Sequence, residues 1–179
     1  VLLRDPSTQE VAIASRFLGE ATGLQNGTPY TWQYGYADVT PAASGAAPTV
    51  GEFTHFKHFR HTKEDGTRWR VGDTYPDKER GYLVIQRVSN NQKLAGHTGR
   101  GQTANVVRWV APVDATIGIV APFAHTTKEG DGIQAWVLHS RIGLLQERHL
   151  KPGQGHEFRI EKVEVKAGRG VGIVEAPRG

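Results

Sequence analysis

The sequence predicts an all-β protein, an antiparallel two-sheet β-sandwich that is jelly-roll-like and carries a short N-terminal helix. Three observations predict this class. Apolar and polar residues alternate along many short segments after residue 30, and turns that contain glycine or proline separate these segments. No segment between them is long and periodic enough to form the crossover helix that a parallel sheet requires. The 22 glycines and 9 prolines among 179 residues agree with a chain of many turns.

The helix is expected close to the N-terminus. Residues 7–10, Ser-Thr-Gln-Glu, fit a capping box, in which the serine bonds a free backbone amide and the glutamate reaches back. Apolar residues then recur at helical spacings and a glycine follows at the expected C-cap: Val11, Ala14, Phe17, Leu18 and Gly19. We therefore expect an N-terminal helical extension at residues 1–29 and a β-sandwich domain at residues 30–179.

Strand periodicity begins at residue 30. Trp32, Tyr34 and Tyr36 alternate with small or polar residues, so they share one face of a strand. The small-residue stretch 41–48 is expected to form a surface loop. Further strands are expected at residues 53–59, 68–71, 82–88, 104–110, 117–123, 133–138, 158–165 and 170–174.

Composition excludes several classes of function. The chain has no cysteine, which excludes disulfides, thiolate catalysis and zinc–thiolate sites. Its apolar runs are shorter than the roughly 20 residues of a membrane helix, so we expect no membrane span. The net charge is only +4, and acids interrupt the most basic stretch, residues 57–70. We therefore expect a solvated polar face there and no nucleic-acid partner. The N-terminal residues do not have the sequence pattern of a signal peptide.

The middle of the chain carries a recognisable series of motifs. Gly96-His97-Thr98-Gly99 precedes the run 105–112, Asn-Val-Val-Arg-Trp-Val-Ala-Pro. Together they resemble the "HPG … VVRW-x-AP" signature of planctomycete-type extracytoplasmic proteins, whose sandwich domains occur beside cytochrome c modules in large multidomain chains. Further pieces match in the same order, at residues 32–35, 81–85, 130–133 and 163–168.

This resemblance implies a jelly-roll, carbohydrate-binding-module-like accessory domain in the periplasm or outside the cell, with no established activity. Two departures stand out near the end of the chain. Arg169 replaces the acidic residue of the family pattern. The family also continues into one more strand, so the sandwich domain is expected to lack its last strand and to leave an open edge.

A sugar site on such a sheet needs exposed aromatic rings, because pyranose faces stack on them. Trp69 lies between Arg68 and Arg70 beside a turn, and we expect it to be the most exposed tryptophan. The expected ligand-binding residues are therefore Trp69, Tyr75, Arg68 and Arg70. The other aromatic candidates are Trp32, Trp109, Trp136, Tyr34, Tyr36 and Tyr82. The alternative is that these rings are core anchors, which is the commoner role of tryptophan in sandwiches.

The only metal expected is a structural calcium ion, which takes six to eight oxygen ligands. Asp131 and Glu129 could contribute oxygens, with Asp114 as a further source. The evenly spaced His55, His58 and His61 do not form one site on a strand, because the middle side chain points away from the outer two. No other cofactor is expected.

No motif for catalysis is present: there is no nucleophile elbow, no phosphate-binding loop and no dinucleotide fingerprint. We therefore expect no enzyme. The leading hypothesis is an extracytoplasmic accessory or structural interaction domain, a subunit or module of a larger protein assembly. The alternative is a carbohydrate-binding module that stacks a glycan on exposed aromatic residues. A hydrolase would require two carboxylates within about 10 Å in a cleft.

Overall fold

The computed structural model describes residues 32–43, 46–61, 66–88, 93–97, 101–125, 128 and 130–177. This part of the chain is all-β and antiparallel, with curled sheets and no helix. The predicted N-terminal helix and the rest of the extension, residues 1–29, lie outside the described residues. Nothing in the described ranges forms a helix that could cross a membrane.

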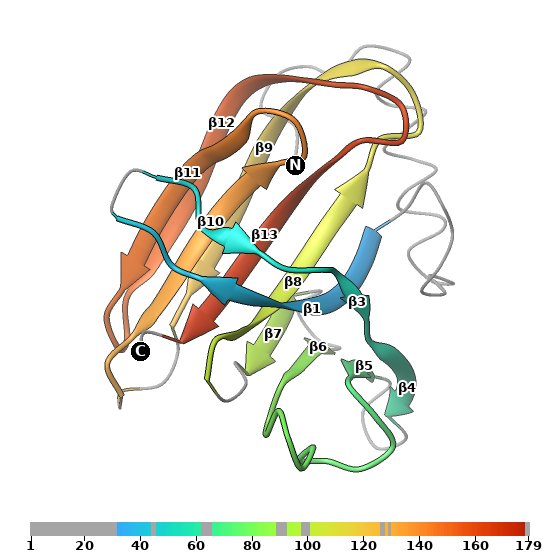
Figure 1. Ribbon diagram of the computed structural model, residues 1–179, viewed down its shortest axis with the longest axis vertical. Helices are drawn as coiled ribbons and strands as arrows, with labels where there is room; N and C mark the ends of the chain where they lie inside the picture. The colour runs from blue at the N-terminus through green and yellow to red at the C-terminus, as the bar shows by residue number, and fades with distance from the viewer. Residues whose placement is uncertain are drawn as a thin grey trace.

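The described residues form thirteen strands, which Figure 1 shows in chain order. They are β1 (Trp32–Thr40), β2 (Thr49–Val50), β3 (Thr54–His55), β4 (Lys57–His61), β5 (Gly66–Arg70), β6 (Val84–Val88), β7 (Lys93–His97), β8 (Thr103–Val110), β9 (Ala115–Ala124), β10 (Ile133–His139), β11 (Gly143–Leu150), β12 (Gly155–Val165) and β13 (Gly170–Pro177).

Three sheets result from their pairing. The large sheet has the order β11-β10-β13-β8-β1-β2, with β3 also paired to β1. The strands β9 and β12 form a long two-stranded ribbon, and β4 to β7 form a four-stranded meander. Figure 1 shows this four-stranded sheet at one end of the molecule. The last strand, β13, lies in the middle of the large sheet between β8 and β10.

All the strands predicted after residue 50 are confirmed, with the segment 53–59 divided into β3 and β4. The strands β2, β7 and β11 were not predicted. The sequence of β11, Gly-Leu-Leu-Gln-Glu-Arg-His-Leu, does not alternate between apolar and polar residues. Its strand conformation depends on pairing with β10, which is a tertiary contact.

Apolar side chains are buried on both faces of the large sheet, because its strands alternate between two clusters. On β8, Trp109 belongs to the cluster that packs the sheet against the β9–β12 ribbon, where Phe158 is fully buried. Val106 points to the opposite face and packs with Val39 and Trp136. Both faces of β8 are therefore buried.

The turn before β10 requires glycine at two positions. Gly130 and Gly132 have φ angles of 93° and 103°, which residues with a side chain rarely adopt. A Cβ atom on Gly132 would also lie 2.4 Å from the carbonyl oxygen of Leu150. This turn therefore tolerates a side chain at Asp131 but not at the position that follows it.

One acidic side chain is embedded in the sheet. Glu175 on β13 is paired in register with Asn105 on β8, and burial raises the pKa of its carboxyl group to about 7. A hydrogen bond from Asn105 lowers the pKa and offsets part of this shift. The carboxyl group is thus largely protonated in mildly acidic solution.

We predict that stability falls as the pH rises from about 4.5 to about 7. In this window the folded chain retains the Glu175 proton that the unfolded chain, with its ordinary pKa of 4.5, has lost. The slope is at most about 1.4 kcal/mol per pH unit. Glu175→Gln should flatten it and stabilise the protein at pH 8, as measured by urea unfolding across the pH range. An unchanged slope in the variant would contradict the prediction.

Candidate functional site

The outer face of the four-stranded sheet carries a group of cations. Lys57 on β4 is paired with Arg70 on β5, and Arg68 lies two residues before Arg70. Paired residues, and residues two apart on a strand, point to the same side of a sheet. Lys57, Arg68 and Arg70 therefore share one face, which we call the basic face.

Trp69 points to the opposite side, and the prediction that it is exposed is wrong. Only 4% of the residue is exposed, and its ring stacks on Tyr34 with 4.1 Å between centroids. It forms a cluster with buried Phe56, Leu83 and Ile85, which joins the small sheet to β1 of the large sheet. The arginines on either side of Trp69 are half-buried and lie on the other face of β5, because side chains alternate along a strand.

The exposed rings at this site belong to two tyrosines from the segment between β5 and β6. Tyr75 is 37% exposed and Tyr82 is 55% exposed. Their ring centroids are 5.7 Å apart and their planes are nearly perpendicular, at 83°. The Tyr75 hydroxyl also donates a hydrogen bond to the Tyr82 carbonyl, at 3.4 Å. We call Tyr75 and Tyr82 the tyrosine pair.

Arg70 connects the tyrosine pair to the basic face. Its guanidinium carbon lies 6.0 Å from the centroid of the Tyr75 ring. The same guanidinium donates a hydrogen bond of 3.1 Å to the carbonyl of Asp73, and the Asp73 carboxylate accepts one of 3.2 Å from Lys57. The polar residues Lys57 and Asp73 were not singled out from the sequence, because only the pairing of β4 with β5 brings them beside Arg70.

A second arginine holds the segment that presents the tyrosine pair. Arg80 donates hydrogen bonds of 2.8 Å to Asp38 and to Thr103, which both belong to the large sheet. Its guanidinium also lies 4.7 Å from the centroid of the Tyr36 ring. The hydrogen bonds from Arg80 and Thr103 lower the pKa of Asp38, so this contact stays ionic below the usual range of a carboxyl group.

The environment of Tyr75 affects its hydroxyl group. Partial burial raises the pKa of Tyr75, while the charges of Arg68 and Arg70 act to lower it. Arg70 lies against the Tyr75 ring, and Arg68 shares the same face of β5. The predicted ligand-binding residues Tyr75, Arg68 and Arg70 therefore lie on one surface, whereas Trp69 lies beneath them in the core.

No group of three potential metal ligands converges among the described residues. Asp131 is exposed and its carbonyl lies 3.4 Å from a ring nitrogen of His149, while Glu129 lies outside the described residues. The third oxygen source, Asp114, bonds Lys166 and the amide of Ala167 instead. The described residues thus do not bring the predicted calcium ligands together.

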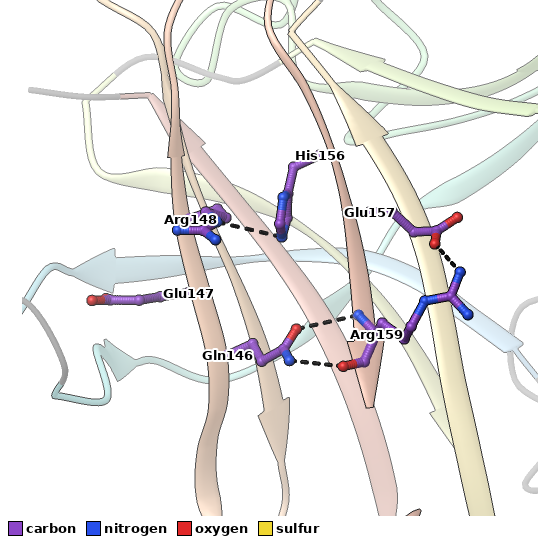
Figure 2. A pocket seen from close by; sticks show the side chains of 6 residues that line it. All are labelled: Gln146, Glu147, Arg148, His156, Glu157 and Arg159. Carbon is purple, nitrogen blue, oxygen red and sulfur yellow. Dashed lines mark hydrogen bonds and ion pairs between the residues drawn. The ribbon is translucent and has the colours of Figure 1, made fainter. Parts of the chain in front are cut away.

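A second candidate is a shallow pocket of about 290 Å³ between β11 and β12. Figure 2 shows the amide of Gln146 bonded to the backbone of Arg159, and Arg148 beside His156, with 3.4 Å between nitrogens. Glu157 forms an ion pair with the Arg159 side chain. Because these polar groups bond one another across the seam between two sheets, we assign the pocket a structural role.

Comparison of the chain with protein-family models, with curated protein sequences and with solved structures found no match.

We predict that Trp69→Ala destabilises the protein by about 3–5 kcal/mol, because it removes a large buried ring from the junction of two sheets. Tyr82→Ala should change the free energy of unfolding by less than about 1 kcal/mol, since this ring is mostly exposed. Chemical denaturation of both variants measures the difference. Equal losses would mean that Trp69 does not anchor the small sheet.

Proposed function

We propose that this chain is a non-catalytic, extracytoplasmic accessory module that binds carbohydrate at the tyrosine pair. The observation that carries the proposal is the exposure of two adjacent tyrosine rings beside arginine side chains. Tyr75 and Tyr82 are two of four large apolar or aromatic residues that are exposed in the described part of the chain. Rings stack on the apolar faces of sugars, and neighbouring guanidinium groups hydrogen-bond sugar oxygens.

The architecture supports this proposal. We propose that the ribbon β9–β12 and the large sheet are the two layers of a jelly-roll-like sandwich, since they bury one apolar cluster between them. The resemblance of residues 96–112 to extracytoplasmic accessory domains agrees with a binding module of this kind, located in the periplasm or outside the cell. In this proposal the four-stranded sheet is an addition to the sandwich, and it carries the binding surface.

The geometry of the tyrosine pair favours a single glycan chain over a crystalline polysaccharide surface. Flat crystalline surfaces match rings that are coplanar, whereas the planes of Tyr75 and Tyr82 meet at 83°. Such a corner lets one ring stack on the face of a sugar while the other contacts its edge. The Arg80 contacts to Asp38 and Thr103 hold the segment that forms this corner, which reduces the cost of ordering it on binding.

We predict that Tyr82→Ala weakens glycan binding about tenfold, equivalent to ~1.4 kcal/mol, because it removes one wall of the corner. The measurement is a glycan array followed by titration calorimetry with the best soluble oligosaccharide. Ile142→Ala is the matched control, because Ile142 is 56% exposed and lies in the turn between β10 and β11. Equal affinity of the Tyr82 variant and the wild-type protein would refute the site.

We also propose that the protein is a subunit or module of a larger assembly. The edge of the β9–β12 ribbon supports this part of the proposal. Within the described residues β9 pairs with β12 alone, and an edge of this kind can pair with a strand of another chain. Pro122 shortens the usable edge, because proline has no amide to donate.

We predict that the amides of β9 exchange hydrogen more slowly in the assembly isolated from its source than in the purified chain. Pairing with a partner strand would bond amides that are otherwise exposed on the edge. The amides of β8 serve as the internal control, since this strand is flanked by β1 and β13 in either state. If β9 exchanges equally fast in both preparations, this edge is not the interface.

A further inference from the structure

The surface beside the tyrosine pair has an excess of positive charge. The basic face contributes three cations, and the only carboxylate bonded to them in the described residues is that of Asp73, so the group carries a net charge of +2. The turn that follows, residues 77–80, contains two acids and two bases and adds no net charge. A neutral sugar would leave this excess without a counter-charge.

The three cations differ in the hydrogen bonds and ion pairs that they form within the protein. Lys57 is paired with the Asp73 carboxylate, and Arg70 donates to the Asp73 carbonyl. Arg68 is half-buried on β5, and no hydrogen bond or ion pair joins its guanidinium to any side chain that the structure describes. It shares its face of β5 with Arg70, whose guanidinium carbon lies 6.0 Å from the centroid of the Tyr75 ring. A guanidinium presents paired donors that match a planar or tetrahedral oxyanion.

Two kinds of polyanion could bind a surface on which cations lie beside aromatic rings. One is an acidic polysaccharide, and the other is a single-stranded nucleic acid. Successive bases stack on separate rings along a groove of many cations. Here the two rings meet at 83° within one corner, and the described side chains of the basic face contribute three cations. These observations favour the polysaccharide, whose charges are fewer and whose sugar faces need one ring each.

We infer that the ligand of the tyrosine pair is an anionic polysaccharide, with Arg68 binding a carboxylate or sulfate group next to the sugar that Tyr75 and Tyr82 contact. This inference rests on the proposed function and specifies its substrate class. Arg70 and Lys57 then act mainly through their charge, because each already has a partner in the protein.

The test uses two pairs of polymers that differ only in charge. Galacturonan is compared with its methyl ester, and dextran sulfate with dextran, by biolayer interferometry with the full chain. We expect the charged member of at least one pair to bind more tightly at low salt, and the preference to disappear near 0.5 M salt, where charges about 10 Å apart are screened. The two pairs separate carboxylate from sulfate recognition.

Arg68→Gln should weaken binding of the preferred charged polymer about five- to tenfold, because one charge-assisted contact is lost. Arg169→Gln removes the same charge from the turn between β12 and β13, and it should leave the affinity unchanged. Thermal unfolding confirms that both variants fold.

Four results would overturn the inference. Equal binding of charged and neutral polymers would refute the anionic preference and leave the proposed carbohydrate site intact. Absence of binding to all four polymers would count against both proposals. Equal weakening by Arg68→Gln and Arg169→Gln would show a general charge effect instead of a site. Tighter binding of a single-stranded oligonucleotide than of any polysaccharide would identify a nucleic-acid surface instead.

Discussion

The stacking of Trp69 on Tyr34 is the contact on which the candidate site depends. It joins the four-stranded sheet to the large sheet through a buried cluster that also contains Phe56 and Leu83. Because side chains alternate along a strand, burying Trp69 directs Arg68 and Arg70 away from the core. The basic face is therefore a consequence of this packing. If β5 presented its opposite face to the core, two guanidinium groups would be buried in place of the indole ring, at a large cost in desolvation.

A second contact, from Arg80 to the large sheet, complements the first. The segment between β5 and β6 has no regular pairing beyond the bridge of Asp77 with Gly81. Arg80 secures this segment by bonding Asp38 and Thr103, and by lying against the ring of Tyr36. A single arginine thus connects a surface turn to two neighbouring strands. The segment of the tyrosine pair is consequently bonded to strands of the large sheet although it forms a loop.

The predictable part of the site follows from local rules. Tyr75 precedes a proline and Tyr82 follows a glycine, and such turn residues present side chains at the surface. Arg68 and Arg70 were named as ligand residues because they flank Trp69 in the sequence. The prediction that Trp69 is exposed was wrong. It relied on the two charged neighbours in the sequence, although alternation places the Trp69 side chain on the opposite face of the strand from theirs. Lys57 and Asp73 could not be found, since their position depends on the register of β4 against β5.

Alternation and turn residues alone determined that the described part of the chain is antiparallel and all-β, and they located most of its strands, because both are properties of a few neighbouring residues. Tertiary structure decided which face of each strand is covered. Periodicity separates Trp69 from Arg68 and Arg70, but only the presence of Tyr34 across the interface makes one side the core. Tertiary structure also decided that β8 is buried on both faces and that residues 143–150 form the strand β11. Both features depend on contacts with residues that are distant in the sequence.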